Sequence, residues 1–170
     1  MTSQTPVTPV IEQRAAQPYL GIRRTVTMAT IGDAAAALAD LADWLTARGI
    51  TPAGPDFLRY HVIDMERELE VEAGVPLPAG TQLAIEAPLG TDVLPAGRYL
   101  TTTHVGDPDE LVAVTGAFLE WAQRNGLRWD ASDTGAGERW GCRLEIYHLG
   151  PDDDPDRSTW QTQLAFRLAD

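Results

Sequence analysis

The chain twice carries a tryptophan followed five residues later by a glycine, in Trp44-Leu-Thr-Ala-Arg-Gly49 and in Trp121-Ala-Gln-Arg-Asn-Gly126. Upstream of each tryptophan, apolar residues recur at spacings of three and four, which predicts the buried face of an amphipathic helix. Each glycine stands where a left-handed C-terminal cap belongs. Runs of extended character flank both helices in the order strand, helix, strand, strand, and we therefore interpret the chain as a duplicated module.

Local signals place the elements of both copies. Asp33 is the candidate cap of the first helix, which is expected to end by Gly49. The second helix opens with Asp107-Pro108-Asp109-Glu110, where aspartate caps, proline takes the first helical position and acidic residues meet the positive end of the helix dipole. The expected strands cover residues 10–13, 19–28, 57–64, 68–75, 98–105, 139–149 and 160–168.

The duplication determines the expected architecture. A three-stranded sheet with one helix leaves its second face bare, and two copies that pair edge to edge form a larger sheet. The predicted fold is α+β: two pseudo-twofold strand-helix-strand-strand modules form a curved antiparallel sheet with helices on one face and a ligand groove on the other. We expect a flexible tail over residues 1–8 and a single domain over 9–170, with modules over about 9–78 and 82–169.

Composition excludes several classes of protein. The chain has 170 residues, of which 44% are hydrophobic, so it can bury a core without metals; its one cysteine, Cys142, rules out a disulfide framework and favours the cytoplasm. There is no basic and apolar leader and no run of about 18 apolar residues, so we expect no secretion and no membrane insertion. A formal net charge of −12 disfavours direct nucleic-acid binding and favours a cationic partner, although solubility alone also explains it.

The stretch from Arg139 to His148 is the most informative for function. Strand alternation divides it into two faces, one with Cys142, Leu144, Ile146 and His148, the other with Gly141, Arg143, Glu145 and Tyr147. The first face is mostly apolar, so we expect it on the helix side and expect Glu145 and Tyr147 to face the groove. A carboxylate between aromatic walls gains from a cationic guest, and its raised pKa would suit acid or base chemistry. A solvent-exposed Glu–Arg pair explains the same pattern.

Further candidates lie on the strands of the first copy. Phe57 and Tyr60 fall on opposite faces of one strand, and alternation does not decide which of them faces the groove. Glu72 on the next strand faces the groove or solvent if its apolar neighbours pack on the helix, and core packing is the alternative for each aromatic. The histidines lack metal-ligand spacing, nucleotide-binding glycine motifs are absent, and 152–156 lacks the ligand pattern of a calcium loop, so we expect no metal and no cofactor.

Motifs spread along the chain resemble a known family. They are Tyr19-Leu-Gly-Ile-Arg-Arg-Thr-Val26, Pro55-Asp-Phe-Leu-Arg-Tyr-His61, Val71-Glu-Ala-Gly-Val-Pro76, Leu94-Pro-Ala-Gly-Arg-Tyr99, Trp140-Gly-Cys-Arg-Leu-Glu-Ile-Tyr147 and Trp160-Gln-Thr-Gln-Leu164. In this order, over about residues 9–169, they are similar to a stand-alone GyrI-like small-molecule-binding domain, the effector-binding domain also fused to AraC- and MerR-type regulators. The resemblance implies a groove between the modules with Glu145 as its acidic floor. It also implies wall candidates, namely Tyr60, Tyr147, Trp140 and Trp160.

The resemblance implies a leading function and two alternatives. The first is binding or sequestration of aromatic, often cationic or hydrophobic small molecules, as in multidrug-binding members. The second is hydrolysis of cyclopropane-bearing alkylating natural products, with Glu145 as the catalytic candidate and Tyr147 or Glu72 assisting. The third is a gyrase-inhibitor-like interaction with a protein partner. No DNA-reading region precedes the strands, so we expect any role in transcription regulation to require a DNA-binding partner.

Overall fold

Both predicted helices form in the computed structural model, which describes residues 8–170. They are α1 (Gly32–Ala47) and α2 (Leu111–Arg124). Gly49 and Gly126 follow them, each with a φ of 69°, which confirms the left-handed caps expected from the repeated motif. Apart from residue 8, the tail expected over residues 1–8 lies outside the described residues.

The two helices begin differently. A 3-10 turn, η1 (Pro108–Glu110), leads into α2, and its entry is a capping box. Asp107 accepts a hydrogen bond from the backbone N of Asp109 at 2.9 Å, and Glu110 accepts one from the backbone N of Asp107 at 3.1 Å, which confirms the predicted start. The expectation that Asp33 caps α1 is wrong, because this helix begins at Gly32 and Asp33 lies within its first turn, without a capping hydrogen bond.

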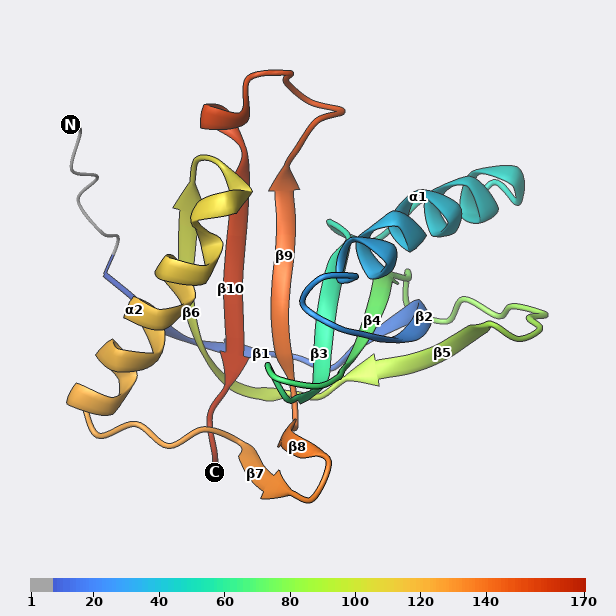
Figure 1. Cartoon of the computed structure of the whole chain (residues 1–170). Coiled ribbons are helices and arrows are strands. Elements are labelled where there is room, and N and C mark those ends of the chain that lie inside the picture. The colour runs from blue at the N-terminus through green and yellow to red at the C-terminus, as the bar shows by residue number, and fades with distance from the viewer. Residues whose placement is uncertain (1–7) are drawn as a thin grey trace.

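Within residues 8–170, ten strands form one sheet (Figure 1). They are β1 (Val10–Arg14), β2 (Gln17–Val26), β3 (Phe57–Ile63), β4 (Leu69–Pro76), β5 (Leu89–Leu94), β6 (Gly97–Val105), β7 (Ala131–Thr134), β8 (Gly137–Trp140), β9 (Arg143–Leu149) and β10 (Gln161–Arg167). A second 3-10 turn, η2 (Arg157–Thr159), precedes β10. The main path of the sheet runs β1-β6-β10-β9-β3-β4-β2-β5, and β7 and β8 form a short ribbon attached to β3.

The strand order is that of a duplicated module. The first copy contributes β3-β4-β2 with α1, the second contributes β9-β10-β6 with α2, and the copies meet where β3 pairs antiparallel with β9. Leu58 of β3 is the register partner of Glu145 of β9 at this junction. Figure 1 shows α2 beside β6 and α1 near β3 and β4, with β9 and β10 between the two helices. The predicted α+β class, with paired modules in a curved antiparallel sheet, is therefore confirmed.

Four strands differ from the expectation. Strands β5 and β7 lie outside the expected ranges; β5 pairs with β2 and extends the sheet at one edge, and β7 pairs with β8. The strand expected over 139–149 divides into β8 and β9 at Gly141, which was placed within it. The Gly141 backbone N donates to the Asp130 carbonyl at 2.8 Å, and a Cβ at this position would lie 1.8 Å from the Asp130 carboxylate. A side chain at this position would displace the Asp130 carboxylate, so glycine permits the close approach at the break between β8 and β9.

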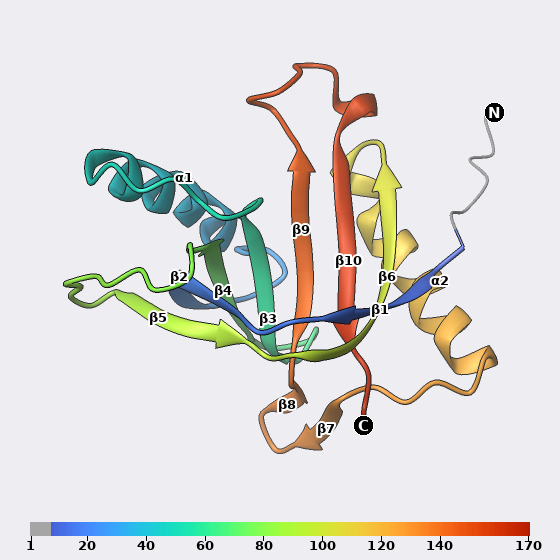
Figure 2. The ribbon, with the colours of Figure 1, turned by 180° about the vertical axis from the view of Figure 1, so that it is seen from behind.

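Each helix covers its own apolar cluster, and a third cluster lies on the opposite face. The α1 cluster includes Leu41, Leu45, Leu58, Tyr60, Leu69, Val71 and Ala73; the α2 cluster includes Leu100, Phe118, Ala122, Trp140, Leu164 and Phe166. The third comprises Tyr19, Phe57, Leu94, Tyr99, Cys142, Leu144, Ile146 and Ala165. Figure 2 shows that β1 and β5 cross this face, so the curl of the sheet covers it without a helix.

The third cluster corrects one expectation about β9. Cys142, Leu144 and Ile146 were expected to face the helices, and Glu145 to face away from them; both placements are wrong. The apolar set packs inside the curl instead. Because strand side chains alternate, Glu145 points to the helix-bearing face, so the expected groove on the face without helices is not where this carboxylate lies.

Candidate ligand-binding site

Glu145 lies at the centre of the helix-bearing side of the sheet. Its register partners are Leu58 of β3 and Leu164 of β10, which pack in the α1 and α2 clusters respectively. Glu145 therefore sits on the strip of sheet between the helices. We call this strip, with Arg143, Glu145 and Tyr147 of β9 and Tyr60 of β3, the Glu145 face. The three β9 side chains are partly buried, and Tyr60 is buried.

Two tyrosines hold the Glu145 carboxylate. The Tyr60 hydroxyl donates a hydrogen bond to Oε1, and the Tyr147 hydroxyl is a second hydrogen-bond partner. Burial raises the pKa of Glu145 above its ordinary value, and the tyrosines and the charge of Arg143 oppose that rise. Burial and the neighbouring carboxylate raise the pKa values of Tyr60 and Tyr147 well above the ordinary value, so both remain neutral donors. Among residues 8–170, no cationic nitrogen lies within 4.0 Å of the carboxylate.

Arg143 is the cation of this face, and it was absent from the predicted site residues. Its guanidinium carbon lies 4.5 Å from the ring centre of Phe166, 4.8 Å from that of Trp140 and 5.9 Å from that of Tyr60. Its nearest carboxylate oxygen, on Glu138, is 4.0 Å away. Burial lowers the pKa of Arg143 from its ordinary value. The signal that could have identified it is the alternation that placed Arg143 beside Glu145.

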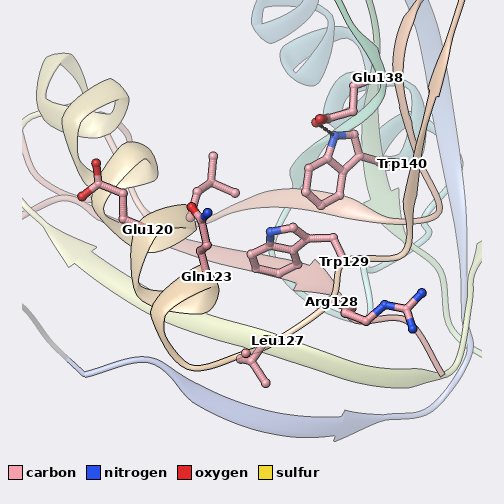
Figure 3. A pocket seen from close by; sticks show the side chains of 9 residues that line it. Glu120, Gln123, Leu127, Arg128, Trp129, Glu138 and Trp140 are labelled. Atoms are coloured by element: carbon pink, nitrogen blue, oxygen red, sulfur yellow. Dashed lines mark hydrogen bonds between the residues drawn. The ribbon is translucent and has the colours of Figure 1, made fainter.

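Trp140 contacts the Glu145 face through Arg143, whose guanidinium carbon lies 4.8 Å from its ring centre. It is 4% exposed, packs in the α2 cluster against Trp129 and Phe166, and donates from Nε1 to Glu138 at 2.6 Å. Trp140 also lines a cavity of about 550 Å³ between the C-terminal end of α2 and β8 (Figure 3). The lining residues are Leu119, Glu120, Gln123, Gly126, Leu127, Arg128, Trp129, Glu138 and Trp140. Trp140 is therefore a core residue that borders this cavity.

Trp160 belongs to the connection between β9 and β10. Its Nε1 donates to the Asp154 carbonyl at 2.7 Å, and the Arg157 guanidinium lies 5.3 Å from its ring centre. These contacts fix the ring within its own loop. The structure therefore gathers Tyr60 and Tyr147 around Glu145 and ties Trp160 to the β9–β10 connection.

Acidic groups lie at one end of the Glu145 face. The backbone N of Tyr147 donates to the Asp56 carbonyl at 3.0 Å, which brings the start of β3 beside this tyrosine. Burial raises the pKa of Asp56, and the charges of Asp152 and Asp153 raise it further. Carboxylates of the β9–β10 connection thus act on the same end of the face, and their combined field attracts cations.

Phe57 and Glu72 are not brought to Glu145. Phe57 packs in the third cluster, edge-on to Tyr19 with ring centres 5.2 Å apart. Glu72 is 5% exposed on the same side of the sheet, where its Oε1 accepts from the Tyr19 hydroxyl at 2.5 Å and lies 2.8 Å from Nε2 of His61. Arg59 donates to the Tyr19 hydroxyl at 2.9 Å and extends this network. Glu72 therefore serves a buried polar network on the face opposite Glu145.

The described part of the chain offers no metal site and no membrane-spanning helix. No group of three or more His, Cys, Asp and Glu side chains among residues 8–170 is arranged to hold a metal ion. None of the helices in this range is both long and apolar enough to cross a bilayer.

Known proteins of similar fold place this arrangement in context. The C-terminal domain of EcmrR superposes with a TM-score of 0.71 at 17% identity, over 95% of this chain and 97% of that chain. The chain spans 57% of EcmrR as seen in its complex with DNA. SAV2435 bound to tetraphenylphosphonium gives a TM-score of 0.60 at 11% identity, over 96% of this chain and 94% of that one.

A hydrolase from Listeria innocua has a TM-score of 0.59 at 14% identity, with 95% of this chain and 91% of that chain covered. At these identities the likenesses show the fold alone. No curated protein sequence matches the chain. The family model of the GyrI-like small molecule binding domain, however, matches residues 8–168. The match spans nearly the whole sequence, and the chain therefore belongs to the GyrI-like small-molecule-binding domain family.

Proposed function

We propose that this chain binds aromatic, often cationic, small molecules on the Glu145 face, with Glu145 as the acidic contact. The observation that supports the proposal is the poorly solvated Glu145 carboxylate, which accepts hydrogen bonds from Tyr60 and Tyr147. Among residues 8–170, no cationic nitrogen lies within 4.0 Å of it. A poorly solvated carboxylate gains more from a bound cation than a solvated one does. The tyrosine rings add cation–π attraction of about 0.5–2 kcal/mol.

The surroundings support the same ligand class. The acidic end of the face around Asp56, and a formal net charge of −12, attract cations from solution. SAV2435, which has the same fold, was solved with tetraphenylphosphonium, an aromatic cation. We extend this ligand class to the present chain as a proposal.

Two probes of equal shape and opposite charge test the role of Glu145. Tetraphenylphosphonium and tetraphenylborate present the same four phenyl rings around a positive or a negative centre. The Glu145→Gln variant keeps the size of the side chain and removes its charge. We expect the variant to bind the cation at least tenfold more weakly, about 1.4 kcal/mol, and the anion more strongly. Affinities are measured by isothermal titration calorimetry.

The matched control is Glu66→Gln. Glu66 is exposed in the turn between β3 and β4, so this variant makes the same change in net charge away from the Glu145 face. It should leave both affinities within about twofold, because exposed charges are screened over about 10 Å. If Glu66→Gln and Glu145→Gln change the two affinities alike, the carboxylate is not the contact.

Hydrolysis is a second candidate, because the same groups suit acid catalysis. A glutamate whose pKa is raised by burial can hold a proton closer to neutral pH, and Tyr60 and Tyr147 can orient a water molecule or a leaving oxygen. A hydrolase from Listeria innocua shares the fold. In the proposed reaction on a cyclopropane-bearing alkylator, water oxygen bonds to a ring carbon and loses a proton. The strained carbon–carbon bond breaks, its electron pair passes through the conjugated ring to the carbonyl oxygen, and the phenolate that forms takes up a proton.

Mass spectrometry tests this reaction directly. The protein is incubated with such an alkylator, and the water adduct is followed over time. Activity that depends on Glu145 would appear as adduct formation that Glu145→Gln lowers. A rate equal to that in buffer would refute hydrolysis for that substrate while leaving binding intact.

A further inference from the structure

The guanidinium of Arg143 has no hydrogen-bond acceptor among residues 8–170. Within residues 8–170, none of its nitrogens donates a hydrogen bond, and its Nε is both buried and without a partner. The closest carboxylate oxygen, on Glu138, is 4.0 Å from Nη1, beyond hydrogen-bond distance. The side chain is nevertheless only 14% exposed. Arginine carries five N–H donors, so this is a concentration of unused donors.

The aromatic rings around Arg143 explain why these donors stay free. Phe166, Trp140 and Tyr60 lie 4.5, 4.8 and 5.9 Å from the guanidinium carbon. Aromatic rings satisfy the charge of a guanidinium through its flat faces, whereas its N–H donors point outward in its plane. The rings thus hold the group in place. Because Nε is buried, the donors available to a ligand oxygen are those of the two terminal nitrogens. A planar fork of this kind matches a carboxylate bidentately.

Arg143 and Glu145 lie close enough for one ligand to reach both. They are two residues apart on β9, so both side chains point to the same face, about 6–7 Å apart along the strand. Tyr60 bridges them, because its ring lies near Arg143 and its hydroxyl bonds Glu145. The Glu145 face therefore presents a carboxylate that can bind a cation next to a guanidinium that can bind an anion.

We propose that Arg143 makes the site selective for aromatic ligands that carry an anionic oxygen together with a positive charge, that is, aromatic zwitterions. The anionic oxygen of the ligand accepts hydrogen bonds from Arg143, while the cationic or aromatic part of the ligand lies against Glu145 and the tyrosines. This inference rests on the proposed function of the Glu145 face, and it narrows the ligand class from aromatic cations to aromatic zwitterions.

A dye pair that differs in one charge tests the selectivity. Rhodamine B carries a free carboxylate and is a zwitterion near neutral pH, whereas its ethyl ester has the same ring system and is a cation. We expect the unmodified protein to bind the acid about tenfold or more tightly than the ester, the contribution of a charge-assisted hydrogen-bond pair. Calorimetry gives both affinities without relying on dye colour. An ester that binds as tightly as the acid overturns the proposal without any variant being needed.

Variants separate recognition from packing. Arg143→Gln should remove the preference for the acid and leave the ester bound at least as tightly, because a positive charge near the cation is lost. Arg143→Lys keeps the charge without the fork and should retain only part of the preference. Arg139→Gln, at an exposed position on β8, is the matched control and should keep the full preference.

The outcomes distinguish this inference from the function on which it rests. If Arg143→Gln weakens acid and ester equally, Arg143 only braces the aromatic cluster, and the inference is wrong. If Glu145→Gln weakens binding of the ester while the acid binds no more tightly than the ester, the proposed function is supported and the inference about Arg143 is wrong. If neither dye binds, both fall.

Discussion

Replacing Glu72 by glutamine tests whether this carboxylate serves the fold, as the structure indicates, or a ligand. Its side chain is 7% exposed on the face opposite Glu145. Oε1 accepts from the Tyr19 hydroxyl at 2.5 Å and lies 2.8 Å from His61 Nε2, and Arg23 is 3.9 Å away. The substitution keeps the shape of the side chain, removes its charge and replaces one carboxylate oxygen by an amide donor.

The expected loss follows from these contacts. A hydrogen bond to a charged acceptor contributes about 1.5–3 kcal/mol and a neutral one about 0.5–1.5 kcal/mol, so two weakened bonds account for roughly 2 kcal/mol. An amide N–H that is left buried without an acceptor costs about 1 kcal/mol or more. We expect Glu72→Gln to lower the free energy of unfolding by about 2–4 kcal/mol near neutral pH.

Urea unfolding followed by tryptophan fluorescence measures this loss, and Glu70→Gln is the matched control. Glu70 lies two residues away on β4 and pairs with the same Arg23 at 2.7 Å, but its side chain is 29% exposed and that of Arg23 is 47% exposed. A pair this exposed contributes about 0–1 kcal/mol. The control should therefore lose less than about 1 kcal/mol.

The pH dependence gives a second readout. The hydrogen bonds from His61 and Tyr19 hold the pKa of Glu72 below its ordinary value, despite the opposing effect of burial. A depressed pKa in the folded state stabilises the protein above the pKa of the unfolded chain, and this stability is lost as the pH falls through the folded value. The difference between parent and Glu72→Gln should therefore shrink at acid pH. A loss within 1 kcal/mol of the control, or one unchanged at acid pH, would refute this account, as would weaker tetraphenylphosphonium binding by the variant.

Two further predictions concern the helix-bearing face. Tyr60→Phe removes the hydroxyl that stabilises ionised Glu145, so the pKa of Glu145 rises further and tetraphenylphosphonium binding should reach half its maximum at a higher pH; an unchanged pH profile in calorimetry would contradict this. Phe118→Ala removes a ring that is 3% exposed and 5.0 Å from the Phe166 ring, and should lower the free energy of unfolding by about 3–5 kcal/mol in urea titrations. Val112→Ala on the same helix, at a position 69% exposed, should change it by less than about 0.5 kcal/mol, and equal losses would mean that α2 is not anchored as described.

Elements with local chemistry of their own were predicted well. The capping box at Asp107 and the glycines at Gly49 and Gly126 act through neighbouring backbone groups, so their sequence suffices to locate both helix ends. Strand β5 could not be predicted because its six residues are mostly exposed at an edge of the sheet and show no apolar alternation. The break at Gly141 could not be predicted either, because the approach of Asp130 is a tertiary contact.

The site residues divide in the same way. Alternation correctly separated Glu145 and Tyr147 from Leu144 and Ile146, because side chains of a strand must point to opposite faces. It could not decide which set the helices cover. That depends on the curl of the sheet, which brings Tyr19 and Tyr99 from distant strands over the apolar set of β9 and leaves Glu145 between the helices.

The sequence by itself determined the duplication, the start of α2, the C-terminal ends of both helices and the two faces of β9, because these follow from short-range periodicity and capping. Only the tertiary structure decided what each face meets. It placed Glu72 and Phe57 in the interior of the curl, Trp140 under α2, and an arginine with free donors beside Glu145. The physical reason is that burial and partner choice depend on strands paired across the sheet, such as β3 with β9, and residue spacing along one strand carries no information about its neighbour.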